Sequence, residues 1–116
     1  MDEPMLAYKI FRDTEWQALR NDGQSLGAPI DLADGFMHLS TGEQAAETAA
    51  KHFAGQDNLM LLAIETEAMA PDLKWEPSRG GALFPHLYRA LRFEEVLWAK
   101  PLPLVDGRHV FPGDGV

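Results

Sequence analysis

The chain has 116 residues, a formal net charge of −8 and no cysteine. Its length suits one domain, residues 1–116, with a core of its own, and the lack of cysteine excludes a disulfide framework and a thiolate zinc site. Because the ten Lys and Arg residues are scattered along an acidic chain, we expect no nucleic-acid partner, whereas a small anionic ligand that meets two or three arginines remains compatible.

The first third of the chain predicts a strand, a helix and a loop. Ala7–Phe11 alternates in the manner of a short strand. A helix follows, which Asp13 or Thr14 can cap and which Gly23 ends. Residues 24–34 contain Gly and Pro and predict a loop.

A brief strand and a second helix are predicted next. Phe36–Leu39 is the strand. Ser40 or Thr41 is a natural N-cap, and Glu43 or Gln44 stands at the spacing of a capping box. The helix then has one apolar face at i, i+4 and i+8, formed by Ala45, Ala49 and Phe53.

The second half predicts more strands than helices. Asn58–Glu65 is the most apolar strand and should be central, and Leu73–Trp75 follows as a shorter one. Glu76–Pro85 is rich in Gly, Pro and Ser and predicts a mobile loop, and His86–Leu91 predicts a helical turn. Glu95–Lys100 predicts a last strand, which the prolines behind it end or mark as an edge.

These elements indicate an α+β fold with short strands and two helices in the N-terminal half, because strands and helices do not alternate regularly. We expect both ends, residues 1–6 and 112–116, to fray. The longest apolar run, Leu59–Ile64, is too short to span a bilayer, so we expect no membrane partner. The acidic start lacks the basic residues of a secretory signal, which favours a cytoplasmic location.

His38 is the first candidate for chemistry. On a strand, Met37 and Leu39 would face the core, which leaves His38 on the opposite face beside the start of the next helix. A helix start attracts anions, and Ser40 and Thr41 add hydroxyls there, so together they could form a ligand cradle. In the alternative, a hydroxyl simply caps the helix and His38 bonds a loop carbonyl.

The second candidate is the segment FPHLY, Phe84–Tyr88. The third candidate is a group of glutamates near strand ends. The face of Tyr88 can stack on a flat ring while its hydroxyl bonds a sugar; alternatively, the segment is a loop anchored by apolar side chains. Glu76, Glu94 and Glu95 lie near strand ends, where a carboxylate could act as a base, although most glutamates of an acidic protein are solvated. No histidine pair has the spacing of a metal site, so we expect no metal.

Two motifs carry a resemblance to a known family. The first, DGFMHLSTGEQ, runs from Asp34 to Gln44 and precedes an alanine-rich helix, and the second is FPHLY. Over residues 8–102 the chain resembles the DUF952 family of small bacterial proteins of unknown function. Members of that family look like the ADP-ribosyltransferase fold. The resemblance therefore implies two small, mostly antiparallel sheets packed nearly perpendicular, with a nicotinamide-dinucleotide cleft between them.

The resemblance also implies roles for individual residues and NAD as the cofactor. His38 would hold a ribose hydroxyl, Tyr88 would stack near nicotinamide, and Glu95 (or Glu94) would bond the nicotinamide ribose and polarise the acceptor. These make His38, Tyr88 and Glu95 the candidate catalytic residues. The further candidate ligand contacts are Ser40, Thr41, His86 and Arg79.

Three functions are compatible with these residues. The first is a nucleotide (NAD or ADP-ribose-like) binding cleft, with ADP-ribosyl-transfer or NAD-glycohydrolase-type chemistry. The second is a non-catalytic module that binds a metabolite or a protein. The third is a hydrolase or phosphoesterase in which His38 and His86 form an acid–base pair.

Overall fold

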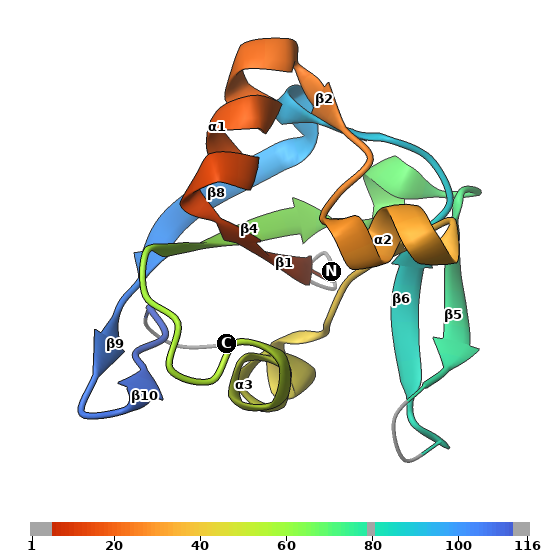
Figure 1. Cartoon of the computed structure of the whole chain (residues 1–116). Coiled ribbons are helices and arrows are strands. Elements are labelled where there is room, and N and C mark those ends of the chain that lie inside the picture. Colours follow the sequence, from red (N-terminus) through yellow and green to blue (C-terminus); the bar gives the residue numbers. More distant parts are fainter. Residues whose placement is uncertain (1–5, 79–80, 113–116) are drawn as a thin grey trace, which may run out of the picture.

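The protein, described by a computed structural model over residues 6–78 and 81–112, is built from two three-stranded antiparallel sheets and three α-helices (Figure 1). Two short 3-10 helices, Thr66–Met69 and Phe93–Glu95, join strands. Among residues 6–78 and 81–112, no helix is long and apolar enough to cross a membrane. The elements in chain order are β1 (Leu6–Arg12), α1 (Asp13–Asp22), β2 (Gln24–Ser25), α2 (Pro29–Asp34), β3 (Met37–His38), α3 (Gly42–His52), β4 (Leu59–Glu65), β5 (Leu73–Pro77), β6 (Leu83–Leu87), β7 (Leu91–Arg92), β8 (Val96–Leu102), β9 (Leu104–Val105) and β10 (Arg108–His109).

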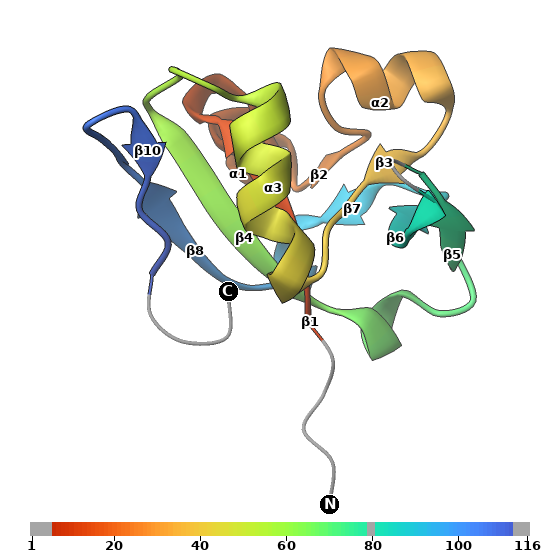
Figure 2. The same cartoon turned by 90° about the horizontal axis from the view of Figure 1, so that it is seen from below.

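The first sheet has the order β1-β4-β8, which confirms that the predicted strand at 58–65 is central. Four successive residues of β4, Leu61 to Ile64, are fully buried. Both faces of the strand are covered, because Leu19 of α1 packs on one face and Ala45 and Ala49 of α3 pack on the other. Figure 2 shows α3 lying along β4, with α1 behind the strand.

The second sheet has the order β3-β6-β5, and its strands run across those of β1 and β4 (Figure 1). Met37 and Leu39 on one side of β3 and Leu87 at the end of β6 are buried in the same cluster as Leu19. The segment behind β3 then changes sheets, because Ser40 bridges to Tyr8 of β1. The two sheets therefore meet at the chain stretch that carries the histidine motif.

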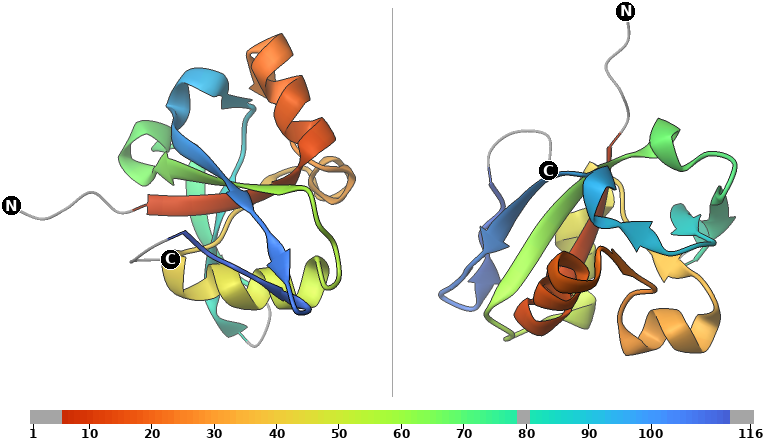
Figure 3. Two further views of the ribbon diagram at one scale, coloured as in Figure 1. Left: turned by 90° about the vertical axis from the view of Figure 1, so that its left-hand side faces the viewer. Right: turned by 90° about the horizontal axis from the view of Figure 1, so that it is seen from above.

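Two small ladders complete the fold. Strand β2 pairs with β7, and β9 pairs with β10. The views in Figure 3 show the β9–β10 hairpin projecting beyond the far end of β8. Strand β8 continues through Pro101, which lies opposite Met60 of β4. Because β8 is an edge strand of the first sheet, proline is tolerated there, as predicted.

Both predicted helices form. Gly23 ends α1 in a left-handed conformation, with φ 80°, as predicted. The N-cap of α1 is Arg12, one residue before the predicted Asp13 or Thr14, because the carboxylate of Glu15 accepts the Arg12 N–H at 2.8 Å.

Helix α3 begins with the predicted capping box. Thr41 is its N-cap, the hydroxyl of Thr41 accepts the N–H of Gln44 at 3.2 Å, and the side-chain oxygen of Gln44 accepts the N–H of Thr41 at 3.0 Å. The predicted apolar face is also present, because Ala45 and Ala49 are buried.

The predicted loop at 24–34 is wrong at both ends, because Gln24–Ser25 form β2 and the second half contains α2, a third helix in the N-terminal half. Pro29 opens this helix, where a missing N–H costs nothing. The side chain of Asp31 accepts the N–H of Ala28 at 2.8 Å, and Gly35 ends the helix with φ 82°. With six residues, α2 is too short for its apolar period to be visible in the sequence.

The predicted loop at 76–85 is wrong at both ends, which belong to β5 and β6, and the predicted helical turn at 86–91 is wrong because β6 runs to Leu87 and β7 begins at Leu91. Strands β5 and β6 form a hairpin in which Lys74 lies opposite His86 and Pro77 lies opposite Leu83. Pro85 sits inside β6, where its carbonyl accepts the N–H of Leu39. Strand β6 pairs with β3 on one side and with β5 on the other, and this pairing outweighs the local preference of Gly and Pro for loops. Predictions about Arg79 and Gly80, and about the ends at 1–5 and 113–116, lie outside the described residues.

Candidate functional site

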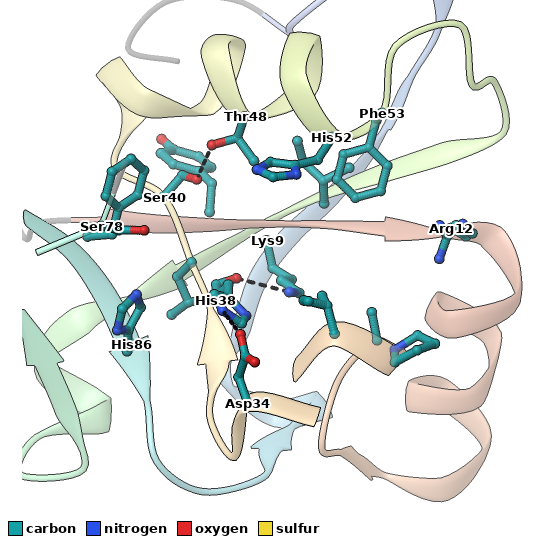
Figure 4. A pocket seen from close by; sticks show the side chains of 17 residues that line it. Lys9, Arg12, Asp34, His38, Ser40, Thr48, His52, Phe53, Ser78 and His86 are labelled. Atoms are coloured by element: carbon teal, nitrogen blue, oxygen red, sulfur yellow. Dashed lines mark hydrogen bonds and ion pairs between the residues drawn. The ribbon is translucent and has the colours of Figure 1, made fainter. Parts of the chain in front are cut away.

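A pocket of about 540 Å³ lies where the two sheets meet (Figure 4). Its walls come from β1, the start of α2, the 38–40 segment, the last turns of α3, and β6. This volume falls in the range of roughly 300–1,000 Å³ that is usual for small-molecule sites. Apolar surface from Ile10, Phe53 and Phe84 alternates with polar side chains around it.

The pocket collects basic and titratable side chains from an acidic chain. Three of the four histidines line it, namely His38, His52 and His86. Lys9 and Arg12 line it as well, whereas Asp34 is the one carboxylate among the described residues of its wall. The lining is therefore more positive than the protein as a whole, which suits an anionic ligand.

Strand β3 presents His38 to this pocket. Met37 and Leu39 are nearly fully buried, and His38 between them points to the opposite face, as the alternation predicts. Nδ1 of His38 lies 2.6 Å from Oδ1 of Asp31, and Nε2 lies 3.0 Å from Oδ2 of Asp34. The imidazole is thus held between two carboxylates, one buried and one exposed.

Asp31 is the anchor of this arrangement. Its buried carboxylate accepts hydrogen bonds from Nζ of Lys9 at 2.8 Å, from the N–H of Ala28 at 2.8 Å and from the N–H of His38 at 3.0 Å. Burial raises the pKa of Asp31, but the hydrogen bonds from His38 and the charge of Lys9 outweigh it and lower the pKa to about 2. Burial lowers the pKa of Lys9, and Asp31 opposes that effect. Asp31 is therefore ionised throughout the neutral range.

His86 lies beside His38, because the two residues are register partners on β3 and β6. Nδ1 of His86 is 2.9 Å from Oε1 of Glu76, and the hydroxyl of Tyr88 donates to the same oxygen at 2.6 Å. The hydrogen bonds from Tyr88 and His86 lower the pKa of Glu76, and the bond to Glu76 raises the pKa of Tyr88. A second carboxylate–histidine pair thus stands next to the first.

Phe36 packs the aromatic rings of the site together. Its ring stacks on His86 with centroids 4.2 Å apart, and lies 4.7 Å from His38 and 5.1 Å from Tyr88. The two imidazole centroids are 5.5 Å apart. Phe36, His38, His86 and Tyr88 therefore form one aromatic cluster.

The other sequence candidates occupy different places. Ser40 lines the pocket, with Oγ 2.8 Å from Oγ1 of Thr48. Thr41 serves as the cap of α3 and is not among the lining residues, and neither is Tyr88, whose hydroxyl is held by Glu76.

Glu95 lies away from the pocket. It receives two hydrogen bonds from the guanidinium of Arg89, at 2.6 and 2.8 Å, and one from the N–H of Arg92 at 3.0 Å. Burial raises the pKa of Glu95, but these bonds outweigh it and keep the pKa below its ordinary value. This carboxylate supports the turn before β8 and does not line the pocket.

Sequence reasoning missed several residues of this site. Asp31 and Asp34 lie in the segment for which the sequence predicts a loop. Lys9 and Arg12 belong to the basic residues that are scattered along the sequence, and their spacing gives no sign of a shared pocket. His52 also lines the pocket, because it follows Thr48 by four residues on α3 and so shares the face that Ser40 contacts.

The histidines His38 and His86 of this pocket each lie beside a carboxylate, from Asp31 and Glu76. Among residues 6–78 and 81–112, no three histidine or carboxylate side chains gather in a group that could hold a metal ion. Two imidazoles with fixed carboxylate partners can give and take protons.

The fold and the pocket define a small α+β domain with a histidine-rich pocket. The chain belongs to the DUF952 family of proteins of unknown function, whose model matches residues 10–99. It is similar to protein CC0527 from Caulobacter crescentus. The crystal structure of that protein is 57% identical with a TM-score of 0.87, over 90% of this chain and 93% of the other. Its solution NMR structure is 56% identical with a TM-score of 0.80, over 90% of each chain. No curated protein matches the chain.

Proposed function

We propose that the pocket binds a nucleotide of the NAD or ADP-ribose type. The observation that carries the proposal is the concentration of three of the four histidines, with Lys9 and Arg12, in one pocket of about 540 Å³ on an acidic protein. A diphosphate needs such positive groups, and a base and riboses need the apolar and hydroxyl-bearing surface between them. The resemblance of the two sequence motifs to the DUF952 family implies an ADP-ribosyltransferase-like fold and so favours the same class of ligand.

The pocket is long enough to give the two ends of such a ligand different partners. In Figure 4, His86 and Ser78 lie at one end, His38 lies centrally, and Arg12 and Phe53 lie at the other end. His38 would hold a ribose hydroxyl. Arg12 at the opposite end would bind a phosphate, because its guanidinium has five donors and the carboxylate of Glu15 engages it through Nη1.

The proposal is confined to binding and does not extend to ADP-ribosyl transfer. That chemistry would assign Tyr88 to stacking and Glu95 to the nicotinamide ribose, and neither side chain lines the pocket. Stabilisation of a positively charged ribose needs a carboxylate close to it. Asp34 is the one carboxylate in the described part of the wall, and it is engaged by His38.

Isothermal titration calorimetry and thermal unfolding with ADP-ribose and with NAD test the proposal. Saturation at a hundred times the dissociation constant should stabilise the protein by about 2.7 kcal/mol. Arg12→Ala should weaken binding about tenfold, because it removes a charge-assisted contact worth roughly 1.5 kcal/mol. Lys51→Ala, on an exposed cation of α3 that pairs with Glu47 outside the pocket, is the matched control and should bind normally.

Adenosine separates phosphate recognition from base recognition. If Arg12 binds phosphate, adenosine should bind more weakly than ADP-ribose to the wild type but equally to wild type and Arg12→Ala. The proposal fails if neither NAD nor ADP-ribose raises the unfolding temperature of the protein at millimolar concentration.

A further inference from the structure

We propose that His38 and His86 act as a general acid–base pair that hydrolyses a phosphodiester, with Asp31 and Glu76 as the positioning residues. The inference rests on the proposed function for the class of substrate, a nucleotide, and adds a reaction to it. It assigns a contact with the substrate to His86 and a positioning role to Glu76.

The first support is the juxtaposition of the two imidazoles. They come from neighbouring antiparallel strands, lie opposite each other in register, and have ring centroids 5.5 Å apart. Both line the same pocket. A phosphate group is small enough to contact two rings at this separation, so one substrate can reach both.

The second support is that each ring is fixed by a carboxylate at Nδ1. Asp31 holds His38 at 2.6 Å, and Glu76 holds His86 at 2.9 Å. An Nδ1 that donates to a carboxylate fixes the tautomer and leaves Nε2 to face the substrate. Each carboxylate also stabilises the protonated form of its ring at the moment when that ring gains a proton.

The third support is that the surroundings of the two rings differ, which assigns the roles. Both nitrogens of His38 face carboxylates, from Asp31 and Asp34, and each of these carboxylates can accept a hydrogen bond from the ring. His86 has one carboxylate partner, Glu76, which lies at its Nδ1. His38 is therefore arranged as the acid and His86 as the base.

The reaction follows from these roles. Nε2 of His86 takes a proton from a water molecule, and the water oxygen forms a bond to phosphorus. The bond between phosphorus and the leaving oxygen breaks, and that oxygen takes the proton from Nε2 of His38. Water is thereby added across one phosphorus–oxygen bond, and the two histidines return to their starting forms by exchanging one proton with solvent.

The same arrangement disfavours acyl transfer through a serine. Neither imidazole bonds a Ser or Thr hydroxyl among the described residues, and Ser40, the nearest hydroxyl in sequence, is paired with Thr48. An anionic phosphodiester also fits the site, because its oxygen can take the place of the exposed Asp34 carboxylate at Nε2 of His38.

Hydrolysis of 2′,3′-cyclic AMP by the purified full-length protein, measured by chromatography between pH 4 and 9, tests the proposal. We expect turnover with a bell-shaped dependence of kcat/KM on pH. His38→Ala and His86→Asn should each lower kcat about 100-fold or more. Asparagine at position 86 retains a donor toward Glu76, so that variant keeps the packing of the buried site.

Glu76→Gln tests the positioning role. It should lower kcat with little change in KM and move the acidic limb of the profile to lower pH, because a neutral amide no longer stabilises the protonated form of His86. Glu76→Asp should recover part of kcat. A purely structural role would leave the profile in place and alter only the amount of folded protein, which the unfolding temperature reports.

The two proposals fail separately. Binding of ADP-ribose without turnover of 2′,3′-cyclic AMP by the folded wild type overturns the acid–base proposal and leaves nucleotide binding intact. Turnover without binding of ADP-ribose or NAD overturns the proposed function. A rate that stays at the wild-type level in His86→Asn, or that changes with pH in one direction only, overturns the paired roles of the histidines.

Discussion

Replacement of Asp31 with asparagine isolates the interaction on which the site depends. Asparagine keeps the shape of the side chain and removes its charge. In the wild type this carboxylate is fully buried and accepts hydrogen bonds from Lys9, from His38 and from the backbone of Ala28. The variant leaves Lys9 buried opposite a neutral amide, so the unfolding free energy should fall.

Two magnitudes bound the loss. The fall in the pKa of Asp31 from 3.8 to about 2 corresponds to about 2 kcal/mol of stability. That figure counts only the preference of the folded protein for the ionised carboxylate. Removing one partner of a buried ion pair costs about 3–5 kcal/mol, because the remaining charge is left without compensation. We therefore expect a loss of about 3–5 kcal/mol at pH 7, or roughly 10–20 °C in the unfolding temperature.

The pH dependence has a definite sign. The pKa of Asp31 is lower in the folded protein than its ordinary value of 3.8, so its contribution is fully present above that value. The contribution is lost as the pH falls through about 2. The difference in stability between the wild type and Asp31→Asn should therefore shrink by about 2 kcal/mol between pH 5 and pH 2.

Urea unfolding followed by tryptophan fluorescence measures these differences. Lys9→Met provides the control, because it removes the cation and leaves Asp31 with its other donors. In the Lys9→Met background, Asp31→Asn should cost less than in the wild type, and the double-mutant cycle gives the coupling. The reasoning is refuted if Asp31→Asn stays within 1 kcal/mol of the wild type at pH 7, or if the two substitutions are additive.

Three further predictions follow from the same geometry. Gly27→Ala should destabilise the protein more than Gly23→Ala in thermal unfolding. Both glycines have positive φ, but only at Gly27 would a Cβ lie 2.3 Å from a carboxylate oxygen of Asp31; equal effects would contradict this. Thr41→Ala should lower the free energy of unfolding, measured in urea, by about 1 kcal/mol, because the N-cap of α3 is lost. An unchanged value would contradict the capping role of Thr41. Glu95→Gln should lower the free energy of unfolding, because it weakens the pair with Arg89, while the affinity for ADP-ribose measured by calorimetry stays unchanged. A weaker affinity would show that Glu95 takes part in ligand binding.

Local patterns were enough to predict the parts of the fold that depend on neighbours in sequence. The capping box at Thr41 and Gln44 and the burial of Ala45 and Ala49 follow from one helical turn. The outward placement of His38 follows from the period of two in a strand. Each of these features involves residues only a few positions apart.

The features that were missed depend on distant parts of the chain. The β5–β6 hairpin forms from a segment rich in Gly and Pro because β6 pairs on both sides, with β3 as well as β5. Glu76 reaches His86 only through that hairpin register, and Lys9 reaches Asp31 across 22 residues. Spacing along the sequence contains no signal for either pair. The histidines and Glu76 could therefore be predicted as candidates, but the pairing of Glu76 with His86 and the role of Asp31 could not.

The buried pair of Lys9 and Asp31 explains why a strand of only two residues can place His38 so definitely. The N–H of His38 donates to Asp31 at 3.0 Å, and its carbonyl accepts from Lys9 at 2.9 Å. A shift of β3 by one residue would turn Met37 toward the pocket and His38 toward the core, and it would also break both of these bonds. Such a buried pair contributes little net stability compared with apolar side chains of the same size. Its benefit is specificity, because it fixes which face of β3 carries the imidazole and hence whether the two histidines can share a substrate.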